Sequence, residues 1–162
     1  MIRHHRIAKT TVCFFVVIGL VAVGASPASA LMAGPRAGVS FEPDQVVLGA
    51  QGKAGLLTKG VGFVPGIEFG LGNDQTVVSI NGDFQVNLPN LPNTNVSFYA
   101  LGGPTVSYFS PDNGDSDTEI GISLGAGMRV PIRAESSYYI ESRFGIGDIP
   151  DLKLIVGALF SL

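Results

Sequence analysis

Apolar and polar residues alternate with a period of two along most of this sequence, and this period restricts the possible folds more than any other feature. The stretch DLKLIVGALFSL, residues 151–162, shows the pattern clearly. One face carries Leu152, Leu154, Val156, Ala158, Phe160 and Leu162, and the other carries Lys153, Ile155, Gly157, Leu159 and Ser161. Side chains alternate in this way in a β-strand, whereas an amphipathic helix has apolar residues three and four positions apart. No stretch beyond residue 30 keeps a helical spacing, so the sequence predicts an all-β chain.

Short segments rich in Gly, Pro, Asn and Asp interrupt the alternation, and turns select these residues for their backbone preferences. Between them the pattern predicts eight strands, at residues 34–42, 46–57, 61–72, 75–88, 95–109, 118–131, 134–147 and 151–162. No linker rich in Pro and Ser divides these strands. We therefore expect a single domain over residues 31–162.

The first thirty residues have the composition of a secretory signal peptide. A basic start is followed by an apolar run, residues 11–24, and then by Ala28 and Ala30 in an A-x-A arrangement. An uncleaved membrane anchor is the alternative, but the run is shorter than the roughly 20 residues that a spanning helix needs. The sequence therefore predicts cleavage after Ala30 and export of residues 31–162.

Cleavage would change the composition of the chain in ways that exclude several functions. Both His residues and the only Cys precede Ala30, and residues 31–162 keep seven basic and thirteen acidic residues, a net charge of −6. Without His or Cys the exported chain cannot build the usual Ser-His-Asp or Cys-His sites, so we expect no enzyme and no cofactor. The acidic balance argues against nucleic acid as a partner.

The two faces of the predicted strands differ in the same way from strand to strand. One face collects large apolar residues such as Phe69, Ile122 and Leu124. The other carries nearly every charge in the strands: Arg36, Lys53, Glu68, Asp83, Arg129, Glu141, Arg143 and Lys153. A soluble barrel or sandwich would turn the apolar face inward, whereas a transmembrane barrel turns it to lipid and fills its lumen with the polar face. Both architectures remain open on the alternation alone.

Strand length and glycine content favour the transmembrane barrel. Most predicted strands run to about 12–15 residues against the usual five or six, and eleven residues tilted by about 45° rise roughly 26 Å, the height of an outer-membrane apolar band. Eleven glycines fall on the polar face, which would leave room inside a narrow barrel for long side chains. We expect Arg36, Arg129, Arg143 and Lys53 to cross the lumen and pair with Glu68, Asp83 and Glu141. The alternative for these glycines is a set of bulges and kinks.

Aromatic residues on the apolar face form two groups if the strands alternate up and down from a periplasmic N-terminus. Phe63, Phe98, Tyr138 and Phe160 would lie near the lower rim, and Phe41, Phe69, Tyr108 and Phe144 near the upper rim. Phe84 would lie between them. Two aromatic girdles of this kind flank the apolar band of outer-membrane barrels.

The C-terminal residues Gly157, Phe160 and Leu162 resemble the Gly-x-x-apolar-x-apolar signal of outer-membrane proteins, although the last residue there is more often Phe. With the signal peptide and the eight strands, residues 34–162 resemble the small OmpA/OmpX-type β-barrel family. The resemblance implies an eight-stranded antiparallel up-and-down barrel in the outer membrane of a Gram-negative cell, present as a monomer. It implies outer-membrane lipid, lipopolysaccharide and the barrel-assembly machinery as partners. It also implies roles in envelope integrity, surface interaction or minor solute passage, and a soluble barrel that binds an apolar ligand is the alternative.

No motif in the sequence makes a convincing catalytic, cofactor or metal site. Asp115, Asp117 and Glu119 have a spacing that could hold Ca²⁺, but Ile120 stands where a calcium loop requires Gly. An acid/base role for the lumen carboxylates is a weaker interpretation than ion pairing. We therefore assign no site residues from the sequence.

Overall fold

The computed structural model describes residues 31–162, apart from residues 59, 90–91 and 134–135. The expected signal peptide, residues 1–30, lies outside the described residues and stays a prediction. Eight strands account for most of the chain: β1 (Met32–Phe41), β2 (Gln45–Thr58), β3 (Val61–Leu71), β4 (Gln75–Asn87), β5 (Ser97–Pro111), β6 (Asp117–Arg133), β7 (Ser136–Ile146) and β8 (Leu152–Ser161). Each agrees with a predicted strand to within a few residues, because Gly- and Asp-rich turns end the alternation where the strands end.

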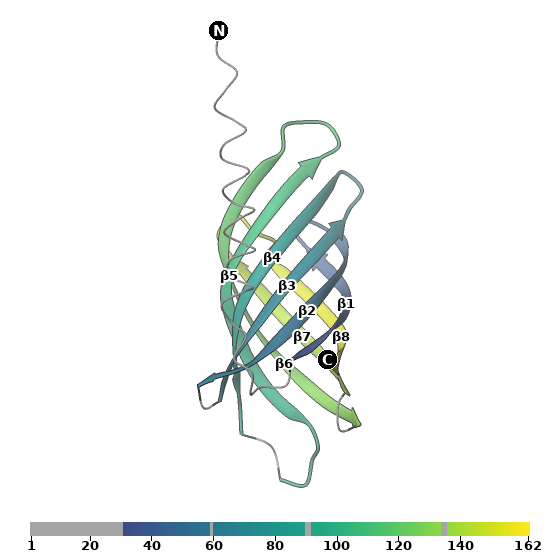
Figure 1. Cartoon of the computed structure of the whole chain (residues 1–162). Helices are drawn as coiled ribbons and strands as arrows, with labels where there is room; N and C mark the ends of the chain where they lie inside the picture. The colour runs from purple at the N-terminus through teal and green to yellow at the C-terminus, as the bar shows by residue number, and fades with distance from the viewer. Residues whose placement is uncertain (1–30, 59, 90–91, 134–135) are drawn as a thin grey trace.

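The strands form a closed barrel in which every neighbour is antiparallel and adjacent in sequence (Figure 1). The last strand closes it against the first, with Met32 opposite Ser161 and Phe41 opposite Leu152. Closure leaves no strand edge with unpaired backbone groups, which a sheet in lipid requires. The structure thus confirms an eight-stranded up-and-down barrel. No helix in the described part of the chain is long and apolar enough to cross a membrane.

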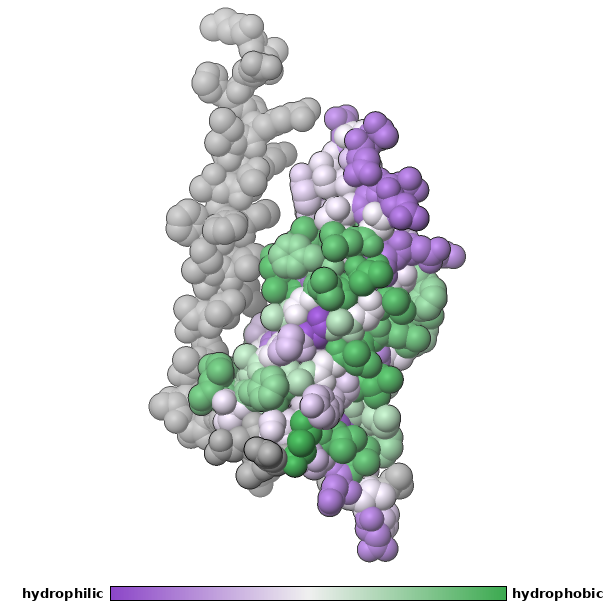
Figure 2. Space-filling view, turned by 90° about the vertical axis from the view of Figure 1, so that its right-hand side faces the viewer, coloured by the Kyte–Doolittle hydropathy of each residue, from purple (hydrophilic) through white to green (hydrophobic). Residues whose placement is uncertain are grey.

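Large apolar side chains face outward around the whole barrel. Phe69, Leu124 and Ile140 are each more than 40% exposed, while Glu68, Ser123 and Glu141, their neighbours in sequence, are at most 6% exposed. Figure 2 shows the result as a hydrophobic belt between two hydrophilic ends. A soluble barrel would bury the apolar face instead. The structure therefore excludes the soluble alternative and makes this chain a transmembrane barrel.

Aromatic side chains occupy both rims of the belt, as the girdle pattern predicted. Phe41, Phe69, Tyr108 and Phe144 are exposed at the strand ends away from the termini, and Tyr138 and Phe160 at the other rim. Phe84, expected between the girdles, instead pairs with Phe63 of the lower girdle, with ring centroids 5.7 Å apart.

The two ends of the barrel differ in their connections and charge. Nine of the thirteen acidic residues lie at the end opposite the termini: Glu42, Asp44, Asp74, Asp112, Asp115, Asp117, Glu119, Asp148 and Asp151. There β5 ends at Pro111 and β6 begins at Asp117. The connection between the predicted strands 95–109 and 118–131 is therefore a projecting hairpin with a five-residue turn. We call this end the acidic end and the other, which holds Leu31 and Leu162, the terminal end.

Candidate functional site

The centre of the barrel lumen holds a compact network of buried ion pairs, which we call the central network. Glu68 on β3 lies 2.9 Å from the Arg36 guanidinium on β1 and 2.6 Å from Lys153 Nζ on β8. Arg143 on β7 lies 2.6 Å from Asp83 on β4 and 3.0 Å from Glu141 on its own strand. The network therefore joins strands from opposite sides of the barrel.

Charge in the central network is balanced, since it contains three cations and three carboxylates. All six residues are at most 7% exposed, so bulk water does not solvate them. Removing such charges from water costs several kcal/mol per ion, and the pairing must offset that cost. Balance and direct contact are the conditions under which a charged lumen is tolerated.

Neutral polar side chains complete the network and connect further strands to it. Glu141 accepts a hydrogen bond from the Tyr99 hydroxyl at 2.8 Å, and Asp83 accepts one from Ser123 at 2.9 Å. Three more contacts join neighbouring strands on the inner face: Arg36 to Gln51, Thr105 to Asn81, and Ser79 with Ser107. The hydrogen bonds from Tyr99 and Ser123 satisfy the carboxylate oxygens of Glu141 and Asp83 that Arg143 does not contact.

The structure changes the expected pairing scheme in two places. Arg36 and Arg143 pair with the predicted carboxylates, but Lys53 does not reach any of them, and Lys153 takes that part. Arg129 donates instead to the Gln85 side-chain oxygen at 3.1 Å and lies over the Tyr99 ring, 5.1 Å from its centroid. The sequence analysis placed Lys153 on the polar face without a partner and overlooked Tyr99, although its position next to Phe98 puts it on the polar face.

Glycines on the inner face leave space for these long side chains, as the polar-face pattern suggested. A Cβ atom added to Gly66 would lie 2.5 Å from an Arg36 guanidinium nitrogen, and one at Gly127 would lie 2.6 Å from the Tyr99 hydroxyl. At Gly157 an added Cβ would meet the Tyr139 ring. These glycines therefore leave the space that the lumen side chains occupy.

Replacing Gly66 with alanine should destabilise the folded barrel by about 1–3 kcal/mol, because Arg36 cannot move away without losing Glu68 and Gln51. Gly52→Ala is the matched control, since its added Cβ would lie 3.5 Å from Pro65 Cγ, an ordinary contact. Urea unfolding of both variants in lipid vesicles measures the difference. Equal stability of the two variants would contradict the inference that Gly66 makes room for Arg36.

An apolar layer closes the lumen below the central network, towards the terminal end. Tyr99 and Leu159 are fully buried and Tyr139 is nearly so, and Met32 packs against Tyr139 and Leu159. Their positions, close to the starts of β5 and β7 and to the end of β8, place them near the terminal end. This layer separates the ion pairs from water on that side.

The turn between β7 and β8 closes the other end of the lumen. Ile149 and Pro150 are buried although they belong to a connection, and Asp151 N–H donates to the Glu42 carbonyl at 3.3 Å. Two inner-face glycines, Gly121 and Gly145, make room for Ile149, because an added Cβ at either would lie 2.9 Å from its Cγ1. Sequence analysis identified this segment only as a turn and missed its role as a cap.

Little free space remains in the lumen beside the cap. Two small cavities there, both lined by Pro150 and Lys153, have volumes of about 0 and 10 Å³. A cavity needs roughly 10–15 Å³ to hold one water molecule. The side chains therefore leave no room for a chain of water molecules in this part of the barrel.

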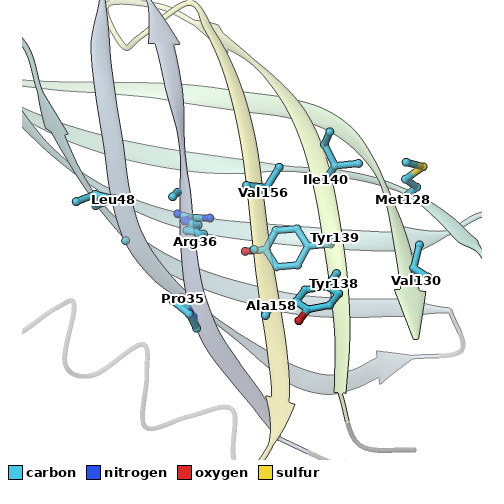
Figure 3. Close-up of a pocket in the computed structure, with 13 residues that line it drawn as sticks. Pro35, Arg36, Leu48, Met128, Val130, Tyr138, Tyr139, Ile140, Val156 and Ala158 are labelled. Atoms are coloured by element: carbon cyan, nitrogen blue, oxygen red, sulfur yellow. The ribbon is translucent and has the colours of Figure 1, made fainter. Parts of the chain in front are cut away.

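A large hollow lies on the outside of the barrel, within the hydrophobic belt (Figure 3). Its volume is about 770 Å³, and the residues that line it include Pro35, Ala37, Leu48, Tyr138 and Ala158. Because it is apolar and lies on the lipid-facing side, hydrocarbon chains of the bilayer are the natural filling.

The lumen carboxylates and the acidic loop, which the sequence analysis considered as chemical sites, are engaged in other contacts. Glu68, Asp83 and Glu141 are held by ion pairs in the central network, which leaves them no solvent path. Asp117 accepts a hydrogen bond from the Thr118 N–H at 2.7 Å. Within the residues that the structure describes, no three acidic, His or Cys side chains lie together in a way that could hold a metal ion.

These features define the class of protein: a closed, eight-stranded membrane barrel with a lipid-facing belt and a charge-balanced network of buried ion pairs inside. Solved structures of such barrels are similar to it. The N-terminal barrel domain of Pseudomonas aeruginosa OprF has a TM-score of 0.69 at 12% identity, over 83% of this chain and 98% of that one. Neisserial surface protein A has a TM-score of 0.63 at 11% identity, over 82% and 96%.

A third similar structure is Ail of Yersinia pestis, with a TM-score of 0.54 at 14% identity, over 83% of this chain and 97% of that one. No family model and no curated protein matches the sequence. The chain thus has the fold of the small OmpA/OmpX-type outer-membrane barrels, as its sequence predicted. The expected outer-membrane location agrees with these neighbours.

Proposed function

We propose that this protein is a non-enzymatic, closed outer-membrane barrel that stabilises the envelope and presents an acidic surface outside the cell, rather than a diffusion channel. The observation that carries the proposal is the central network of buried ion pairs, which lies between the Ile149–Pro150 cap and the Tyr99–Leu159 layer. A small barrel whose interior is occupied by side chains has no open path for solutes.

Outer-membrane lipid and lipopolysaccharide contact the belt in this proposal, and the barrel-assembly machinery reads the C-terminal strand. The protein acts as a monomer, because closure of the sheet leaves no edge to pair with a second copy. The exposed acidic end favours cationic partners over polyanions, since no exposed Lys or Arg side chain lies there among the described residues. In this respect it differs from a neighbour, Ail, solved in complex with the heparin analogue sucrose octasulfate.

Planar-bilayer recordings of the purified monomer should show little or no steady conductance, because the central network and both closing layers block the lumen. A heat-modifiable band on unboiled gels, typical of a closed barrel that resists unfolding, should confirm that the recorded protein is folded. Large and steady single-channel steps from such a preparation would show that solutes pass, and would overturn the closed-barrel proposal.

Cell fractionation tests the location separately. The belt should keep the protein with the outer membrane through a carbonate or urea wash, because its exposed apolar side chains have no soluble partner surface. A peripheral outer-membrane protein released by the same wash is the control. Recovery of folded, detergent-free protein from the soluble fraction would rule out membrane integration.

A further inference from the structure

Two cations at the terminal end of the lumen stand apart from the central network. Lys53 lies on β2 opposite Met32, at the start of β1, and Arg129 lies on β6 opposite Ser97, at the start of β5. Both are half-buried on the inner face, at the mouth below the apolar layer of Tyr99 and Leu159. They face the lumen opening and not the lipid belt.

The two side chains approach the same level of the barrel, Lys53 from β2 and Arg129 from β6. Arg129 donates to Gln85 Oε1 at 3.1 Å, and its guanidinium carbon lies 5.1 Å from the centroid of the Tyr99 ring. The Lys53 stem passes close to Gly62, because a Cβ added to Gly62 would lie 3.7 Å from Lys53 Cε. Gly62 is the strand partner of Gln85, so Lys53 and Arg129 converge on Gln85.

Neither cation has a counter-charge among the residues that the structure describes. Arg36, Arg143 and Lys153 each have a carboxylate within 3.0 Å, whereas Lys53 and Arg129 form no ion pair in the described part of the chain. The Arg129 Nε atom is buried and has no hydrogen-bond acceptor. Two neighbouring like charges without a counter-ion are unfavourable, and an unused guanidinium N–H adds the cost of an unsatisfied buried donor.

A tetrahedral oxyanion at the mouth would supply the missing counter-charge. It would neutralise both charges and accept hydrogen bonds from the Arg129 guanidinium and from the flexible Lys53 ammonium. Arg binds phosphate oxygens through a planar fork of donors, and Lys adds a point charge. We propose that the terminal mouth binds a phosphate oxyanion between Lys53 and Arg129. Because both side chains face the lumen opening, inorganic phosphate from the periplasm is favoured over a lipid headgroup.

The test is calorimetric titration of inorganic phosphate into the folded full barrel in phosphatidylcholine nanodiscs, with chloride at the same ionic strength as the reference. Phosphate should bind saturably and chloride should not. Lys53→Gln and Arg129→Gln should each weaken binding at least tenfold, and Arg129→Lys, which keeps the charge but loses the fork, should weaken it as well. Asp148→Asn, an exposed change at the acidic end, is the control and should leave the affinity within about twofold.

A second arm identifies the source of the phosphate. Nanodiscs that contain phosphatidylglycerol should leave the affinity for inorganic phosphate unchanged if the ligand is a solute, and should abolish the titration if a headgroup fills the site. Both glutamine variants should keep the heat-modifiable band, because neither residue forms an ion pair that the fold needs. Equal heats for phosphate and chloride, or undiminished binding in folded Lys53→Gln and Arg129→Gln variants, would overturn the proposal.

Discussion

Replacing Arg143 with methionine should destabilise the barrel by about 3–5 kcal/mol, the cost of removing one partner from a buried charge pair. Arg143 contacts both Asp83 and Glu141, and all three side chains are at most 2% exposed. Without the guanidinium two carboxylates remain in the lumen with only Ser123 and Tyr99 as donors. Reversible urea unfolding in lipid vesicles, in a buffer without phosphate, measures the loss.

Arg129→Met is the matched control for this variant, because it removes a lumen arginine that has no carboxylate partner among the described residues. It loses one hydrogen bond to Gln85 and the contact with Tyr99, together worth about 1–2 kcal/mol. The triple variant Arg143→Met, Asp83→Asn, Glu141→Gln should recover most of the lost stability, since no net charge is left unpaired. A loss no larger for Arg143→Met than for Arg129→Met would mean that the ion pairs of the central network contribute little to stability.

Introducing arginine at Leu124 should cost about 2–4 kcal/mol, because it places a charge near the middle of the bilayer. Leu124 is 48% exposed on the hydrophobic belt, while Ser123 beside it is buried and donates to Asp83. Lumen substitutions that stay polar should be milder, so Ser123→Asn is the control, with a smaller loss limited by the space available. The same unfolding measurement in vesicles compares the two.

Leu124→Ala distinguishes a lipid-facing leucine from a core leucine. In a packed core the change leaves a cavity and costs about 2–5 kcal/mol. Against lipid, fluid chains fill the space, and the loss should approach the transfer term of about 1–2 kcal/mol. A cavity-sized loss at Leu124 would contradict the assignment of this face to lipid.

Strand positions and the division into two faces could be read from the sequence because both depend on local spacing. The predicted strand at 75–88 and the observed Gln75–Asn87 differ by a single residue, since turn residues bound the alternation on both sides. The two-residue alternation alone likewise placed Arg36, Glu68 and Arg143 on the same face. Closure of residues 151–162 against the first strand followed from the need to leave no open edge.

Contacts across the lumen depend on quantities that the alternation does not contain. The two-residue alternation puts Lys53 and Lys153 on the same face. The stagger of the strands around the barrel, however, brings Lys153 to Glu68 and leaves Lys53 at the mouth. The inward fold of Ile149 and Pro150 is a property of one turn and of the space left by Gly121 and Gly145. The sequence thus determined which residues face inward, because side-chain direction repeats every two residues. Only the tertiary structure decided which of them meet, because that depends on how eight tilted strands are staggered when the sheet closes.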